Sequence, residues 1–305
     1  MSIIEDQYER IAKGKGFIAA LDQSGGSTPK ALKNYGIQEN EYESDEQMFT
    51  LVHQMRERIM TAPAFSGDKI IGAILFEKTM DDVVKGLPTA RYLWDSLKIV
   101  PFLKVDKGLA DQEDNAQLMR DIPDLSKLLS KAKKAGIFGT KMRSVIHGAS
   151  QKGIHNVINQ QFEIGLTILE HGLVPIIEPE ISINAPDKNE CEEISKQEIL
   201  AQLNKLDKNK KVMLKLTLPE KNGFYKELIN HDNILRVVAL SGGYDLEEAC
   251  QRLAANPGMV ASFSRALTND LNVKQNDQEF NQVLEKAIDK IYEASVHDKV
   301  IQNAA

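Results

Sequence analysis

The sequence has few of the residues that mark disulfide-rich or metal-binding proteins. It contains only two cysteines in 305 residues, and their spacing fits neither a disulfide framework nor a zinc site. Its six histidines show no spacing typical of metal ligands. We therefore expect no metal and no other cofactor, and a reducing cytoplasm as the location.

Long apolar runs and strongly basic segments are also missing. No hydrophobic stretch reaches the length that a membrane helix needs, and residues 1–16 are too polar for a signal peptide. The net charge is −6, and no basic stretch dominates as it would in a nucleic-acid-binding protein. We expect a cytoplasmic protein whose partner is a small molecule, with neither a membrane nor a nucleic acid involved.

What the sequence does contain is a regular alternation of strand-like and helix-like segments. Short runs rich in β-branched residues predict eight buried strands, at residues 16–22, 70–76, 99–105, 137–142, 174–178, 211–217, 235–240 and 258–263. Helical periodicity is found at 3–12, 41–60, 155–172, 194–207, 245–255 and 277–296. The alternation is typical of the α/β class. It predicts a single (β/α)8 TIM barrel over residues 1–305, with an extra N-terminal helix and a C-terminal helix.

An open, doubly wound sheet is the alternative architecture for such an alternation. It would ordinarily carry a G-x-G-x-x-G nucleotide fingerprint after an early strand. The segment DQSGGSTPKAL, which follows the first predicted strand, lacks that spacing. We therefore favour the barrel, whose chemistry takes place at the carboxyl ends of its strands.

Charged residues stand at the ends of four consecutive predicted strands. They are Lys104, Lys141, Glu178 and Lys215. A charge in a buried strand is costly unless it is paired or used in function. The other strand ends add Asp22, Arg143, Glu180, Ser241 and Arg265. Structural ion pairs would explain two or three of these charges, but convergence at so many strand ends favours a catalytic site.

Lys215 lies in the segment VMLKLT, with apolar neighbours on both sides. Beside other cations we expect a depressed pKa and a free amine that attacks carbonyl groups through a Schiff base. Lys141 is the competing candidate for this role, and a structural ion pair with Glu178 or Glu180 is the alternative for Lys215. The two glutamates point the same way from an extended strand, so they could divide the roles of acid and base.

Two loops have the composition of anion-binding sites. Ser241, Gly242 and Gly243 lead from the seventh strand into a helix, and Arg265 follows the eighth strand. Glycines let backbone N–H groups approach an anion, and these two loops are the usual phosphate site of the barrel.

A second anion site is suggested by the loop after the first strand, which contains Ser24 and Ser27. Together with Lys104 it could hold another phosphate. A plain turn before a capped helix is an equally good interpretation of the same residues.

These segments resemble class I, Schiff-base-forming fructose-1,6-bisphosphate aldolases of the bacterial branch. The resemblance covers about residues 16–270 and rests on seven motifs in order: ALDQSGGS, PFLKVDKG, GTKMRSV, VPIIEPEI, VMLKLT, ALSGG and FSRAL. It implies the reversible cleavage of fructose 1,6-bisphosphate to dihydroxyacetone phosphate and glyceraldehyde 3-phosphate, in glycolysis or gluconeogenesis. The covalent intermediate would replace a metal.

The resemblance also implies roles for the candidate residues. Lys215 would form the Schiff base and Glu178 would be the principal acid–base residue. Glu180 and Lys141 would assist proton transfer, while Asp22 would bind the C4 hydroxyl or support its deprotonation. The 1-phosphate would be held by Ser241, Gly242, Gly243 and Arg265. Ser24, Ser27 and Lys104 would lie towards the 6-phosphate, with Arg143 in support.

The sequence departs from the animal members of that family. Gln23 replaces an acidic residue of the first motif, and the chain ends in VIQNAA without the tyrosine that animal enzymes use in enamine protonation. Glu178 is our candidate for that protonation, and a monomer or small homo-oligomer is our expectation for the assembly. Alternatives are another Schiff-base barrel, such as a transaldolase, a dehydratase or an aldolase that takes tagatose bisphosphate, and a phosphate-binding barrel without catalysis.

Overall fold

The computed structural model describes residues 2–24 and 28–296. Eight strands follow one another in the parallel order β1-β2-β5-β7-β8-β9-β10-β11. They are β1 Phe17–Leu21, β2 Ile70–Leu75, β5 Val100–Lys104, β7 Gly139–Ile146, β8 Val174–Ile181, β9 Val212–Thr217, β10 Ile234–Leu240 and β11 Met259–Ala261. The two edge strands meet where the backbone N–H of Ala20 donates to the carbonyl of Phe263 at 3.3 Å. This closure confirms the predicted (β/α)8 barrel.

The strands form because their residues are apolar on both faces. Every residue of β1, β2 and β9 is buried, as expected where a parallel sheet is filled inside and covered by helices outside. Inside the barrel, one cluster of side chains fills the space between the strands. It includes Ile18, Ala20, Ile71, Ile74, Val100, Phe102, Ile176, Met213, Val238 and Val260.

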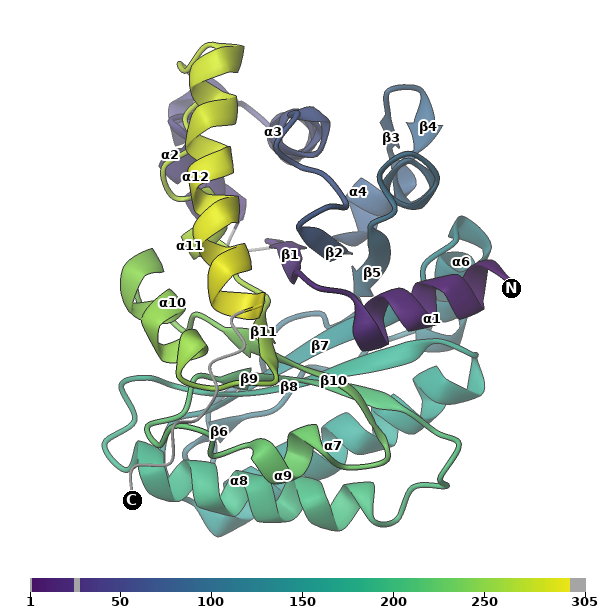
Figure 1. Ribbon diagram of the computed structural model, residues 1–305, viewed down its shortest axis with the longest axis vertical. Helices are drawn as coiled ribbons and strands as arrows, with labels where there is room; N and C mark the ends of the chain where they lie inside the picture. Colours follow the sequence, from purple (N-terminus) through teal and green to yellow (C-terminus); the bar gives the residue numbers. More distant parts are fainter. Residues whose placement is uncertain (1, 25–27, 297–305) are drawn as a thin grey trace.

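Helices alternate with the strands and cover the outer surface (Figure 1). The longer ones are α1 Ile3–Lys13, α2 Thr28–Tyr35, α3 Asp45–Thr61, α6 Leu125–Ala135, α7 Gln151–Glu170, α8 Lys188–Leu203, α10 Leu246–Ala254 and α12 Asp277–Val296. Short elements are α4 Glu77–Asp81, α5 Thr89–Arg91, α9 Lys226–Ile229 and α11 Arg265–Thr268, a hairpin of β3 Val83–Val84 and β4 Leu87–Pro88, and β6 Ala116–Gln117, which pairs with β7. All six predicted helices are present.

Helix α1, the predicted extra N-terminal helix, lies across the amino ends of the strands (Figure 1). Ile11 is fully buried against the interior cluster, and the Arg236 guanidinium at the start of β10 donates to the carbonyls of Ile11 and Gly14, both at 2.9 Å. The sequence pattern places Ile3 and Ile4 on one apolar stripe with Ile11, and this prediction is wrong at the first turn, where Ile3 and Ile4 are 56% and 58% exposed. One turn of helix overhangs the barrel end there.

Helix α12 confirms the predicted apolar face of the C-terminal helix. Phe280, Leu284, Ala287, Ile288 and Ile291 are buried, and they follow the helical spacing found in the sequence. In Figure 1 the helix stands beside α10 and α11. No helix in residues 2–24 and 28–296 is long and apolar enough to cross a membrane.

Candidate active site

A cavity of about 1020 Å³ opens at the carboxyl ends of the strands. Most of the side chains that the sequence singled out line it: Asp22, Ser24, Lys104, Lys141, Arg143, Glu178, Glu180, Lys215, Ser241, Gly242 and Arg265. Gly243 lies beside the lining, and Ser27 is outside the described residues. Lysines and arginines outnumber carboxylates along the wall. Residues far apart in the chain therefore converge on one basic cavity.

Four alternating charges form the floor of this cavity. The Lys141 Nζ lies 2.6 Å from Asp22 Oδ2 and 3.1 Å from Glu178 Oε2. The Lys215 Nζ lies 3.1 Å from the other oxygen of Glu178. None of the four side chains is more than 9% exposed. Such a buried cluster is tolerated because each charge has an opposite neighbour.

The protonation of Asp22 and Lys141 is set by this arrangement. Burial on its own raises the pKa of Asp22, but Lys141, Lys215 and Lys104 together hold that pKa well below its usual range. Burial lowers the pKa of Lys141, yet Asp22 and Glu178 raise it well above its usual value. Asp22 is therefore a carboxylate and Lys141 an ammonium across the physiological pH range.

Glu180 and Glu178 have different partners. The Arg143 Nε donates to the Glu180 carboxylate, whereas Glu178 lies between two lysines. Burial lowers the pKa of Arg143, but Glu180 and Glu178 raise it. Both glutamates face the cavity, as their spacing of two residues in a strand predicted.

Asp106 is a buried carboxylate that the sequence interpretation missed. The Lys104 ammonium donates to Asp106 Oδ1 at 2.7 Å and to the Asp106 carbonyl at 2.8 Å. The residue is 6% exposed and lines the cavity. Its position in PFLKVDKG, two residues after Lys104 and hence on the same side of an extended chain, was the available signal.

The sequence interpretation also missed Arg56 on α3, because this helix is rich in polar residues and an arginine in it is expected to be exposed. It is 1% exposed, and its guanidinium donates to Thr79 Oγ1 at 2.7 Å and to the Gln23 carbonyl. Burial lowers the pKa of Arg56 to about 10, while Asp22 raises it. The guanidinium therefore fixes the backbone of the residue directly after Asp22 to α3.

Gln161 reaches Glu178 from the outer layer of helices. It is fully buried on α7, and its Oε1 accepts from the Glu178 backbone N–H at 2.8 Å. Its Nε2 donates to Ser144 Oγ at 3.1 Å, on the neighbouring strand. The sequence gives no clear signal for this role, because a glutamine in a helix looks like an ordinary exposed residue.

The loop after β10 contains two glycines in backbone conformations that other residues rarely adopt. Gly242 and Gly243 have φ of +62° and +123°, which favour glycine, and a Cβ on Gly242 would lie 2.7 Å from Ile183 Cγ2. A Cβ on Gly243 would lie 3.7 Å from an Arg265 nitrogen. Asp245 caps α10 by accepting from the Glu248 N–H at 2.8 Å, so that helix end already has an acidic partner. The cap of α10 therefore uses neither Arg265 nor the N–H groups of Gly242 and Gly243.

The loop after β1 is tied to the loop after β11. The Gln23 Nε2 donates to Ser264 Oγ at 2.7 Å, next to Arg265. Gln23 thus links the two loops. Within residues 2–24 and 28–296, no group of His, Cys, Asp and Glu side chains is arranged to hold a metal ion.

Comparison with known proteins places these features in a family. A family model for fructose-bisphosphate aldolase class-I matches residues 4–225. The chain is 57% identical over 299 residues to the class 1 fructose-bisphosphate aldolase of Synechocystis sp., covering 97% of this chain and 100% of the relative. It is 54% identical over 292 residues to the class 1 enzyme of Porphyromonas gingivalis, covering 96% and 99%.

The fold comparison agrees. A fructose-bisphosphate aldolase from Plasmodium falciparum superimposes with a TM-score of 0.76 at 23% identity, over 96% of this chain and 95% of that one. The chain belongs to the class I fructose-bisphosphate aldolase family.

Proposed function

We propose that the protein cleaves fructose 1,6-bisphosphate reversibly to dihydroxyacetone phosphate and glyceraldehyde 3-phosphate, in glycolysis and gluconeogenesis, through a Schiff base on Lys215. The observation that carries this proposal is the 3.1 Å contact between the Lys215 amine and the Glu178 carboxylate at the floor of a basic cavity. Membership of the class I aldolase family supports it.

Lys215 is a better nucleophile than Lys141 in this arrangement. Lys141 lies between two carboxylates, which hold it as an ammonium that has no free electron pair. Within the described residues, Lys215 has an ion pair with Glu178 alone, and that carboxylate can accept the proton that the amine must lose. The ion pair expected as a structural alternative is thus compatible with catalysis.

The reaction uses these groups in order. The neutral Lys215 amine attacks the C2 ketone, and Glu178 protonates the carbinolamine hydroxyl so that it leaves as water. Glu178, now a carboxylate, takes the proton of the C4 hydroxyl as the C3–C4 bond breaks, and the electron pair of that bond moves into the iminium to form an enamine. Glyceraldehyde 3-phosphate leaves. Glu178 protonates the enamine at C3, and hydrolysis of the iminium releases dihydroxyacetone phosphate.

Asp22 and Lys141 prepare the C4 end of the substrate. Because its pKa lies well below its usual range, Asp22 is a weak base and acts chiefly as the acceptor that orients the C4 hydroxyl. The Lys141 ammonium stabilises negative charge as the bond breaks and, with Glu180, assists proton transfer.

The two phosphates take opposite ends of the cavity. Ser241, Gly242, Gly243 and Arg265 hold the 1-phosphate, and Ser24, Ser27 and Lys104 hold the 6-phosphate, with Arg143 in support. The surplus of basic side chains on the wall matches a substrate with two phosphates. The chemistry needs no metal or other cofactor. A cytoplasmic enzyme that works as a monomer or small homo-oligomer remains our prediction.

A cleavage assay in excess EDTA tests this function. The purified protein should cleave fructose 1,6-bisphosphate at the same rate with and without EDTA, and tagatose 1,6-bisphosphate more slowly. Activity that EDTA removes and a divalent metal restores would contradict the Schiff-base mechanism. Turnover of neither bisphosphate would favour the non-catalytic alternative.

A further inference from the structure

Strands β8 and β9, which carry Glu178 and Lys215, are paired over only a short stretch. The paired residues are Ile176 with Met213 and Ile177 with Leu214. On their other sides, β8 pairs with β7 and β9 pairs with β10 along their whole lengths. Glu178 and Lys215 are the first residues beyond the last pair between the two strands. Continuous backbone pairing therefore does not fix their separation.

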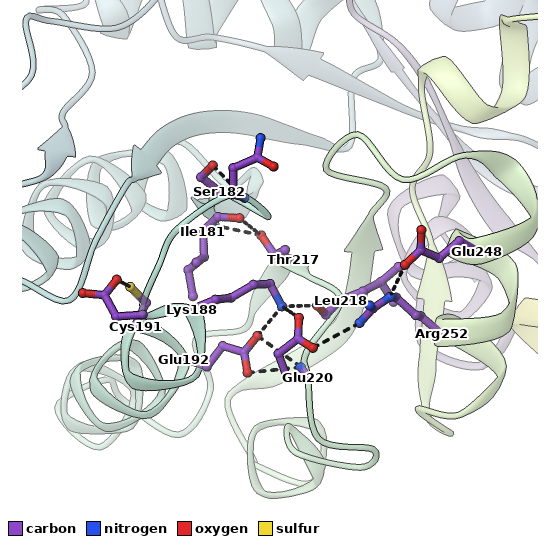
Figure 2. A network of polar contacts seen from close by, with 12 residues as sticks. Ile181, Ser182, Lys188, Cys191, Glu192, Thr217, Leu218, Glu220, Glu248 and Arg252 are labelled. Atoms are coloured by element: carbon purple, nitrogen blue, oxygen red, sulfur yellow. Dashed lines mark hydrogen bonds and ion pairs between the residues drawn. The ribbon is translucent and has the colours of Figure 1, made fainter.

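The Thr217 side chain rejoins the two strands just beyond this gap (Figure 2). Its hydroxyl donates to the Ile181 carbonyl at 2.7 Å and accepts from the Ile181 N–H at 2.9 Å. A hydroxyl can make both bonds because it has one donor and two lone pairs. Thr217 is 1% exposed, so no bulk water competes for these groups.

The gap has a cause in the sequence of β8. Thr217 comes three positions after Leu214 on β9, whereas Ile181 comes four positions after Ile177 on β8. The extra residue shifts the register, as in a bulge. Pro179 lies in this stretch and has no N–H to donate to a ladder. One side-chain hydroxyl replaces the backbone pairing that β8 cannot continue.

We propose that Thr217 is a positioning residue, whose hydroxyl spans the gap between β8 and β9 and keeps the Glu178 carboxylate within reach of the Lys215 amine. This inference rests on the proposed function, because it assigns the acid and the nucleophile as above. Thr217 is not among the residues that line the cavity. It acts through the two strands, and a catalytic site loses rate steeply when such supports are loose.

The segment after Thr217 is anchored separately, so loss of the hydroxyl should leave the fold intact. The buried Lys188 ammonium donates to the Leu218 carbonyl at 2.9 Å, and also contacts Glu192 and Glu220 at 2.6 and 2.8 Å (Figure 2). These bonds fix the start of the loop to α8. Glu178 itself is held on its other side by Gln161.

Thr217→Val tests the proposal, because it keeps the shape of the side chain and removes the hydroxyl. We expect kcat to fall on the order of 10- to 100-fold with KM within about threefold, since a misplaced catalytic pair affects the chemical step. Borohydride trapping of dihydroxyacetone phosphate on Lys215 should slow in parallel, and the pH profile of kcat should shift. Thr217→Ser, which keeps the hydroxyl, should restore kcat to within about threefold of wild type.

Thr140→Val is the matched control. Thr140 is a fully buried threonine on β7 whose hydroxyl has no hydrogen-bond partner in the described part of the chain. The same change there should leave kcat unchanged. A kcat for Thr217→Val within twofold of this control would overturn the proposal. If Thr217→Val does not fold, the pair Thr217→Ser and Thr217→Ala isolates the same hydroxyl, and equal kcat in both would also overturn it.

The wild-type protein separates this inference from the function on which it rests. Absence of a borohydride-trapped adduct on wild-type Lys215 would refute the proposed mechanism itself. Normal trapping in wild type with a normal rate in Thr217→Val would refute only the positioning role.

Discussion

The Lys141 ammonium lies 2.6 Å from the Asp22 carboxylate and joins two strands that are not neighbours in the barrel. β7 carries the lysine and β1 ends directly before the aspartate, with β2 and β5 between them. The pair spans the interior below the cavity. Both charges are therefore fixed in place before any substrate arrives, which is the arrangement that electrostatic catalysis requires.

Asp22→Asn should lower the free energy of unfolding at neutral pH and make that free energy less dependent on pH in the acid range. Removing one partner from a buried ion cluster costs about 3 kcal/mol, because Lys141 loses its closest carboxylate. The folded-state pKa of Asp22 is lowered, so its contribution is complete above its unfolded-state pKa of about 3.9 and is lost as the pH falls below that value. Urea unfolding between pH 7 and pH 3 measures both effects.

The surface pair of Lys69 and Asp289 provides the control for this change. Its side chains are 36% and 45% exposed, so Asp289→Asn should cost less than about 1 kcal/mol. A wild-type protein and an Asp22→Asn variant that lose stability in parallel below pH 4 would show that the Asp22 charge is not stabilised in the fold.

Lys188→Met should destabilise the protein by about 3 kcal/mol, and more at pH 8 than at pH 5. The ammonium lies between Glu192 and Glu220, and its removal leaves a buried carboxylate without its cation. Burial already raises the pKa of Glu192 despite Lys188. Without the lysine we expect that pKa to rise further, so the carboxyl stays protonated at pH 5 and the cost appears as the pH increases. Thermal unfolding at the two pH values measures the difference.

Two further variants check that interpretation. The double variant Lys188→Met with Glu192→Leu should recover part of the stability, because no buried charge remains on α8 at that site. Lys196→Met, in the same helix, removes a contact over the Phe224 ring and should cost less than about 1 kcal/mol. Equal losses at Lys188 and Lys196 would argue against a buried charge effect.

Both cysteines should be unreactive in the folded protein. Burial and the neighbouring Asp187 raise the pKa of Cys191 to about 12, and burial raises the pKa of Cys250 to about 11. At pH 8 almost no thiolate is present to attack a disulfide reagent. We expect slow colour release with Ellman's reagent in buffer and rapid reaction of both thiols in urea. Stoichiometric labelling within minutes in buffer would contradict this prediction.

The strands were predictable from sequence because each contains a short apolar run that no helix period fits. Two strands are longer than predicted: β8 continues to Ile181 beyond the predicted end at residue 178, and β7 continues to Ile146 beyond the predicted end at residue 142. Its later part contains Arg143 and Ser144, which look like loop residues. They stay in the strand because they pair with β8 and because their side chains meet partners in the site and in α7.

The start of a helix was less predictable where its first turns contain charged residues that become buried. The predicted helix at 194–207 begins at Lys188, six residues earlier, since its first turns are charged and seem solvated. Lys188 and Glu192 are in fact buried against one another. The pattern of polar residues alone cannot show that two charges neutralise each other inside the fold.

The residues of the candidate site were predictable on the strands but not on the helices. Lys104, Lys141 and Lys215 were visible because a lysine inside an apolar strand is unusual. Arg56 and Gln161 were not, because a polar residue in a helix has no such contrast with its neighbours. Their burial arises only when the helices pack on the barrel.

Reductive trapping tests the central claim most directly. The protein is incubated with dihydroxyacetone phosphate, reduced with borohydride, digested and examined by mass spectrometry. We predict one reduced adduct, on Lys215. In Lys215→Met we predict no adduct and no activity, with the fold retained because Glu178 keeps its contact with Lys141. An adduct on Lys141, or none on the wild-type protein, would contradict the account.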